Sequence, residues 1–264
     1  MEITVAKDSV VEKTLQLTAD HQLHITVESG AQLRLLLEGC CGQLVTEAVV
    51  GEGATLDLCN LDMNIAGTTR THDLHILQEA NSQAFVQSIS LAAGNTHNTT
   101  QADLNGEGAE LHLNGLVIAN QSQRIENHTL VQHMVSHTTS HQLYKYVLDD
   151  KAVGTYAGLV KVLPGAHHTV SVQTNRNLCA TREARMFAQP QLEIYNDDVR
   201  CNHGSSTGQL DESALFYMQQ RGISKHEARL LLMAAFVGEV VNQIRIPALR
   251  ERLHDLIENR FRNI

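Results

Sequence analysis

The spacing of hydrophobic residues changes once along the chain. Up to about residue 200, hydrophobic and polar residues alternate with a period of two, as in Glu110-Leu-His-Leu-Asn114 and His168-Thr-Val-Ser-Val172. This alternation predicts strands with one buried face. From Leu210 onward the period becomes 3.6, which is typical of amphipathic helices. The pattern therefore predicts a β region over residues 1–209 and a helical domain over residues 210–264.

A short repeat recurs within the β region. The pattern Gly-Ala-x-Leu-x-Leu begins at Gly30, Gly53 and Gly108, and a degenerate copy begins at Gly165. Its spacing indicates a coil of roughly 20–30 residues per turn, within the range of repeat architectures. Glycine would turn the corner, alanine would fit the crowded bend, and the two apolar residues would point inward. We therefore favour a β-helix over the alternative, a β-sandwich.

Three helices are expected in the C-terminal region. The first follows Asp211 and ends near Gly222, which can adopt the left-handed conformation. The second begins with the capping box Ser224-Lys-His-Glu227, and its apolar residues surround the helix axis almost completely. We expect this helix to be buried, either within its own domain or against a partner. The third begins at Pro247 and carries one apolar face, formed by Leu249, Leu253, Leu256, Ile257 and Phe261.

Composition narrows the classes of protein. The 264 residues are 42% hydrophobic and only 4% aromatic, without tryptophan, so we expect an ordered core of Leu, Val, Ile and Ala. The net charge is −9, and the acidic excess lies in the strand region, which disfavours nucleic-acid binding. The apolar run 230–237 is too short to cross a membrane, and the first residues do not resemble a signal peptide. These features predict a cytoplasmic protein without a membrane partner.

Cysteine and histidine provide the main candidates for metal chemistry. The five cysteines include no C-x-x-C pair, which argues against a zinc ribbon and against a self-contained iron–sulfur cluster. Cys201 and His203 are two residues apart, so in a strand their thiol and imidazole would face the same side as possible iron or zinc ligands. Two ligands do not complete a site, and an inert cysteine beside a hydrogen-bonded histidine is the alternative. The adjacent pair Cys40-Cys41 most simply places one side chain on each face of a strand.

Two further groups leave alternatives open. His133, His137 and His141 could form a ladder on one outer face, or belong to a solvated polar face with one buried histidine. Asp149-Asp150 and Asp197-Asp198 could serve a β-helix polysaccharide lyase or hydrolase, with calcium or as acid and base, but adjacent aspartates are also common in turns. Walker A, G-x-S-x-G and H-E-x-x-H motifs are absent from the sequence.

Five ordered segments resemble the SufB/SufD family of iron–sulfur cluster assembly proteins. They are Tyr144-Lys-Tyr-Val-Leu-Asp-Asp150, Gly158-Leu-Val-Lys-Val162, Gln173-Thr-Asn-Arg-Asn-Leu178, Pro190-Gln-Leu-Glu-Ile-Tyr-Asn-Asp-Asp-Val-Arg-Cys-Asn-His-Gly204 and Leu215-Phe-Tyr-Met-Gln-Gln-Arg-Gly-Ile223. The resemblance runs from about residue 130 to 262. The C-x-H-G form at Cys201 to Gly204 is that of the SufD branch.

The resemblance implies a mainly β fold: a right-handed parallel β-helix with a C-terminal α-helical domain. It implies that His203 lies at an interface with a SufB-like subunit, near that partner's assembly cysteine, with Cys201 as a weaker neighbour. Asn175 stands where SufB carries this cysteine. It further implies a complex with a SufC-like ABC ATPase docking on the C-terminal helices, where Phe216, Tyr217, Arg221 and Gly222 lie. Longer members carry an N-terminal helical region, whereas this chain starts directly in strand pattern.

The resulting hypothesis is a non-catalytic, SufD-like scaffold subunit of a SufBCD complex. A cluster needs about four ligands, mostly thiolates, and this chain offers too few in one place. We therefore expect an iron–sulfur cluster or iron that is transient and shared with the partner subunit, with His203 and Cys201 as candidate metal ligands. The alternatives are the polysaccharide enzyme and a standing zinc protein using Cys201 and His203. Pairing as a homodimer stays open beside the heterodimer.

Overall fold

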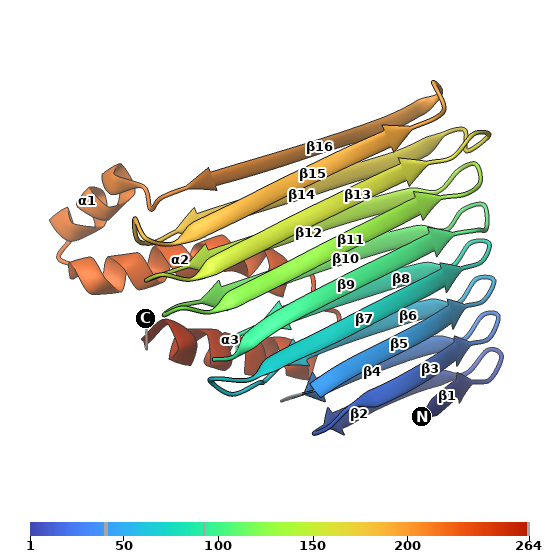
Figure 1. The fold of residues 1–264 in the computed structure, drawn as a ribbon, viewed down its shortest axis with the longest axis horizontal. Helices are drawn as coiled ribbons and strands as arrows, with labels where there is room; N and C mark the ends of the chain where they lie inside the picture. Colours follow the sequence, from blue (N-terminus) through green and yellow to red (C-terminus); the bar gives the residue numbers. More distant parts are fainter. Residues whose placement is uncertain (40–41, 92, 263–264) are drawn as a thin grey trace.

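A computed structural model describes residues 1–39, 42–91 and 93–262 of the chain. Within these residues, successive strands alternate between two parallel eight-stranded sheets, so strands two apart in the chain are neighbours in a sheet (Figure 1). Sheet A contains β1 (Glu2–Val5), β3 (His21–Val27), β5 (Gly42–Val50), β7 (Thr69–Gln78), β9 (Asn95–Leu104), β11 (Arg124–His133), β13 (Val153–Val162) and β15 (Arg185–Ile194). Sheet B contains β2 (Val10–Leu17), β4 (Gln32–Gly39), β6 (Thr55–Asp62), β8 (Gln83–Ser90), β10 (Glu110–Ala119), β12 (Thr139–Leu148), β14 (Thr169–Cys179) and β16 (Val199–Gly208). The expected mainly β solenoid is confirmed, and the sandwich alternative is wrong.

The length of each coil follows from the strand register. Val10 pairs with Gln32 on the next coil, and Val153 pairs with Arg185, so one coil contains 22 to 32 residues. This range agrees with the period expected from the repeat. Because all pairs are parallel and in register, equivalent residues of successive coils form columns through the interior.

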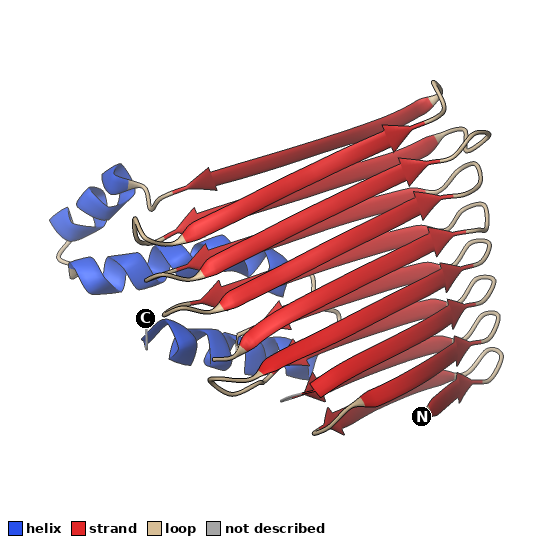
Figure 2. Ribbon diagram, in the orientation of Figure 1, coloured by secondary structure: helices blue, strands red, loops and turns tan. Residues whose placement is uncertain are grey.

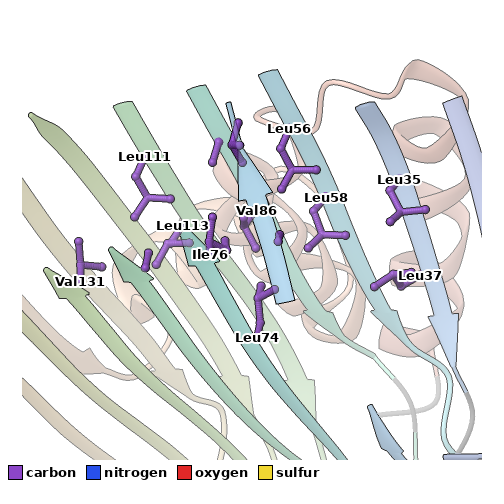
Figure 3. Close-up of a cluster of buried hydrophobic side chains, with 14 of the residues drawn as sticks. Leu35, Leu37, Leu56, Leu58, Leu74, Ile76, Val86, Leu111, Leu113 and Val131 are labelled. Carbon is purple, nitrogen blue, oxygen red and sulfur yellow. The ribbon is translucent and has the colours of Figure 1, made fainter. Parts of the chain in front are cut away.

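Three of the four repeat copies form the predicted corner. Gly30, Gly53 and Gly108 have φ between +65° and +75°, where a side chain would be strained. The alanine after each glycine is buried, and the two following leucines fill the interior between the sheets (Figure 3). Each six-residue repeat therefore specifies both a corner of the coil and two positions of the core.

The fourth copy of the repeat begins three residues before the corner of its coil. Gly165 has a positive φ, but the residue at the corner of this coil is His168, with φ +55°, followed by the fully buried Thr169. The turn is longer here, so Thr169 points inward and Val170 does not. The backbone N–H of His168 donates to the Asp198 carbonyl of the next coil at 2.8 Å. Other corners also use non-glycine residues with positive φ: Asp8, Asn81 and His137.

The interior is not aliphatic throughout. Tyr144, Tyr146 and Tyr156 are buried in the later coils, which differs from the expected core of Leu, Val, Ile and Ala. Glycines make room for these rings: a Cβ at Gly115 would overlap the Tyr144 ring. The sequence Tyr144-Lys-Tyr146 places both rings inward because residues two apart share a face.

Three helices follow the last strand: α1 (Glu212–Gln220), α2 (Lys225–Val241) and α3 (Pro247–Arg262). The Asp211 carboxylate caps α1 by accepting from the backbone N–H groups of Ser213 and Ala214. Ser224 and Glu227 form the predicted capping box at the start of α2. In the described part of the chain, no helix is long and apolar enough to cross a membrane.

The helices α2 and α3 cover the outer face of sheet B (Figure 2). Outward-facing side chains such as Leu61, Leu116 and Val147 share one apolar cluster with α2 and α3, so the second helix is buried against the chain's own sheet. Lys145, buried on β12, binds the Glu239 carboxylate at 2.6 Å and the Phe236 carbonyl at 2.7 Å. This contact offsets the cost of burying the ammonium group. The predicted orientation of Cys40-Cys41 lies outside the described residues.

Candidate functional site

The last coil of the solenoid is open. β15 ends sheet A and β16 ends sheet B, and neither strand has a further strand beside it in the described residues. β16 lies at the end of the stack of strands (Figure 1). Most of its side chains are exposed, whereas those of the neighbouring strand β14 are mostly buried. An uncovered strand edge presents backbone N–H and C=O groups that another chain can pair with.

His203 occupies the last position of an interior column. On β16, His203 pairs with the fully buried Gln173 of β14, and Gln173 in turn pairs with Gln142 of β12. No strand covers His203 within the described part of the chain, so its side chain is exposed although it has the inward parity. Toward the start of the chain the column continues as the buried, apolar Leu113, Val86, Leu58 and Leu35, and it begins at the exposed Lys13 on β2.

Cys201 lies two residues before His203 on the same strand. It is half-buried and packs against the edge of the apolar core. Burial raises the pKa of its thiol, and a backbone hydrogen bond involving Ser171 opposes this effect. Because the thiolate is the metal ligand, the chain alone leaves Cys201 poorly prepared for coordination.

Asn175 lies on β14, next to this pair, but it is fully buried and hydrogen-bonded. Its Nδ2 donates to the Tyr144 carbonyl at 3.2 Å, while its Oδ1 accepts from Asn177 at 2.6 Å and from the Ser205 hydroxyl at 3.1 Å. Ser205 is the β16 residue in register with Asn175. The side chain thus links the open strand to the coil beneath it.

The structure therefore places the three predicted site residues on the last two strands of sheet B, at inward-facing positions of neighbouring columns. The pair Cys201 and His203 offers at most two metal ligands. Among the residues described, neither belongs to a group of three or more His, Cys, Asp or Glu donors close enough to hold one ion. A complete metal or cluster site at this end would need donors from another molecule.

A second open surface lies on the helices. Phe216 and Tyr217 on α1 are about 60% exposed, and the Arg221 guanidinium lies 5.2 Å from the centre of the Tyr217 ring. Gly222 ends α1 with φ +86°, as its predicted role in closing the helix requires. It also borders an apolar groove of about 810 Å³ between α2 and α3, lined by Ile223, Leu230, Val237, Ile257 and Phe261 among others.

The aspartate pairs do not form a joint site. Asp150 lies in the turn between β12 and β13, with φ +49°, and its carboxylate accepts from the Gln121 backbone N–H. Asp197 and Asp198 lie in the turn between β15 and β16, which is at the opposite edge of the solenoid (Figure 1). Asp198 pairs with His168 at 3.1 Å. The pairs act as turn residues, so the geometry gives no support to a polysaccharide-cleaving site built from both.

The three histidines proposed as an outer ladder are separated by the fold. His133 lies on β11 and is buried inside the solenoid, between the hydroxyls of Thr138 at 2.7 Å and Ser140 at 2.8 Å. Burial lowers its pKa to about 4. His137 is a corner residue, and His141 lies on β12. Of the two alternatives the outer ladder is wrong, because a turn separates His133 from His141, whereas one buried histidine agrees with the other alternative.

One group of donors was not identified from the sequence. His97 on β9 and Glu126 and His128 on β11 lie together on the outer face of sheet A. Glu126 and His97 are 29 residues apart, which is the length of one coil at this point. The available signal was this spacing combined with strand parity, and it can be used only when the register of the coils is known.

Fold and site together define a class of protein: a parallel β-solenoid with a helical layer on one sheet and an open last coil carrying a histidine and a cysteine. The chain belongs to the SufB/SufD family. Residues 10–236 match the family model described as "SUF system FeS cluster assembly, SufBD core domain".

Several curated relatives support the SufD side of this family. The chain is 32% identical over 182 residues to the iron–sulfur cluster assembly protein SufD of Escherichia coli, covering 69% of this chain and 43% of that protein. It is 29% identical over 217 residues to an iron–sulfur cluster assembly SufBD family protein of Synechocystis, covering 82% and 48%. It is 26% identical over 220 residues to SufD of Bacillus subtilis, covering 83% and 50%. The chain thus spans half or less of the length of these relatives.

Proposed function

We propose that this chain is a non-catalytic scaffold subunit for iron–sulfur cluster assembly, which contributes His203 to a site shared with a SufB-like partner. The observation that carries the proposal is the open last coil. His203 ends an interior column there, on a strand with an unpaired edge, so a partner strand placed against β16 would enclose the imidazole.

The chemistry of the donors supports a shared site. A cluster is usually held by about four ligands, mostly thiolates. Of the cysteines the structure describes, Cys59 and Cys179 are buried and Cys201 is half-buried, and burial raises the pKa of each thiol. A cluster held by thiolates from the partner and an imidazole from this chain would be bound weakly enough to be released.

The helices fit the second part of the proposal, docking of a SufC-like ATPase. Phe216 and Tyr217 form an exposed aromatic pair, and Arg221 beside Tyr217 is exposed as well. Exposed aromatic residues next to an arginine are typical centres of protein interfaces. Since α2 and α3 pack on sheet B, movement of the docked ATPase would be transmitted to the solenoid through contacts such as Lys145 with Glu239.

Reconstitution with SufB-like and SufC-like subunits tests both parts. We expect His203→Ala to lower iron and sulfide bound to the complex several-fold, because one ligand is lost, while the complex still forms. Asn202→Ala is the matched control, since Asn202 is exposed on the opposite face of the same strand. We expect its replacement to leave the cluster yield unchanged. Wild-type yield from His203→Ala would refute the role of His203.

The docking surface is tested in the same mixture by co-purification of the ATPase. Removing residues 211–264 is unsuitable, because the outer face of sheet B would lose its apolar cover. The double variant Phe216→Ser, Tyr217→Ser changes exposed side chains only, and we expect it to lose the ATPase while keeping the SufB-like subunit. Retention of the ATPase would refute docking on α1. Pairing of two copies of this chain, seen by light scattering before the partner is added, would show that the chain also forms a homodimer.

A further inference from the structure

Three donors of the kind that bind transition metals converge on the outer face of sheet A. Glu126 and His128 are two residues apart on β11, so both point outward. His97 on β9 is in register with Glu126, which places it beside that carboxylate in the neighbouring strand. The three side chains are each about 40% exposed.

The distances between donor atoms match those around one small cation. His97 Nδ1 lies 3.0 Å from Glu126 Oε2, His128 Nε2 lies 3.7 Å from the same oxygen, and the three donor atoms all lie within 4.8 Å of one another. Ligands bound to zinc at about 2.0–2.1 Å in a tetrahedron are separated by about 3.3 Å. Small rotations of exposed side chains would therefore bring all three donors onto one ion.

The chemistry of the three donors also favours certain metal ions. Two imidazoles and one carboxylate suit zinc and other first-row divalent metals, whereas calcium and magnesium prefer oxygen ligands. Three protein ligands leave at least one coordination position for water or an exogenous ligand. His128 also borders a depression of about 290 Å³ in this face of sheet A, whose other lining residues include Thr99, Ala157 and Gln189.

We propose that His97, Glu126 and His128 bind one first-row divalent transition-metal ion, with open positions for an exogenous ligand. The site lies on the outer face of sheet A, whereas His203 has an inward position on sheet B, so this proposal is independent of the proposed function. The competing explanation is a surface hydrogen bond between His97 and Glu126 with His128 as a neighbour.

Zinc titration of the purified full chain distinguishes these explanations. Isothermal titration is expected to show one zinc equivalent that disappears in His97→Ala and in His128→Ala. Glu126→Gln keeps the shape of the side chain but removes the charge, and we expect at least about tenfold weaker binding. The matched control is His75→Ala. His75 lies on the same face and pairs with Asp103 at 2.8 Å, but it belongs to no three-donor group among the described residues, so its loss leaves this equivalent intact.

Two further measurements separate this site from others and from misfolding. Cobalt bound at the site should give visible bands without thiolate-to-cobalt charge transfer, because no cysteine takes part, whereas cobalt at Cys201 would show that transfer. Zinc should raise the unfolding temperature of wild type and of His75→Ala, and raise it less or not at all in Glu126→Gln. Equal zinc binding by wild type, His97→Ala and His128→Ala would overturn the proposal, as would equal loss in His75→Ala.

Discussion

The two ends of one interior column differ in chemistry. In the early coils, after the exposed Lys13 of β2, the column consists of Leu35, Leu58, Val86 and Leu113, all buried and part of the apolar core. In the later coils the same column continues as Gln142 and Gln173 and ends at His203. All of these residues lie on parallel strands paired in register, so the difference lies in the side chains.

The early end stabilises the fold by burying apolar surface, which requires no specific partner. The late end buries amides, which cost free energy unless every donor and acceptor is bonded. Gln142 accepts from Thr129 at 2.9 Å and from Tyr156 at 3.2 Å, but the Gln173 carbonyl oxygen has no hydrogen-bond partner in the described structure. We infer that stability comes mainly from the early coils.

The largest expected effect is therefore at the apolar end. Leu58→Ala removes a side chain that is 1% exposed and leaves a cavity between two sheets, so we expect a loss of about 2–5 kcal/mol in the free energy of unfolding, measured by urea denaturation. Leu231→Ala is the control: Leu231 is 52% exposed on α2, and its replacement should cost less than about 0.5 kcal/mol. Equal losses in the two variants would show that the early coils do not carry the stability.

The apolar end was also the part best predicted from sequence. Gly30, Gly53 and Gly108 mark corners because a positive φ favours glycine, and the leucines that follow show strand parity directly. The later coils lack these markers. His137 and His168 occupy the same kind of corner. The sequence pattern instead assigned His137 to a strand and His168 to the interior of a degenerate repeat.

The candidate site shows the same limit. Cys201 and His203 could be paired from sequence because strand parity is local. Their exposure depends on β16 being the last strand, and the group of His97, Glu126 and His128 depends on the register between coils. Position along the solenoid and coil register are properties of the whole chain, so the local pattern could not supply them.

A smaller effect is expected from the polar end. The Tyr146 hydroxyl accepts from Asn127 at 2.7 Å and donates to the Thr155 carbonyl at 2.8 Å, inside the later coils. Tyr146→Phe keeps the ring but removes both hydrogen bonds in a buried place, so we expect a loss of about 1–3 kcal/mol in unfolding free energy. Tyr195→Phe, at an exposed tyrosine, should change little. A neutral Tyr146→Phe would mean that the hydrogen bonds of the polar end contribute no net stability.

The effect that is smallest at neutral pH is a dependence of stability on pH, which compares the two ends through one buried histidine in each. Burial lowers the pKa of His133 to about 4, and burial together with the nearby Arg70 lowers that of His72, in an earlier coil, to about 3. In the unfolded chain both would take up a proton near pH 6.5. Between pH 6.5 and 4.5 the unfolded state therefore binds more protons, and stability falls as pH falls, by up to about 1.4 kcal/mol per pH unit for each histidine.

We expect His133→Gln and His72→Gln each to flatten this slope, and the double variant to remove both contributions, since the two sites share no hydrogen-bond partner. Urea denaturation at several pH values checks this, and above pH 7.5 each variant should differ from wild type by a constant offset. A slope unchanged in His133→Gln would mean that the polar end opens to water and protonates His133 before the early coils unfold.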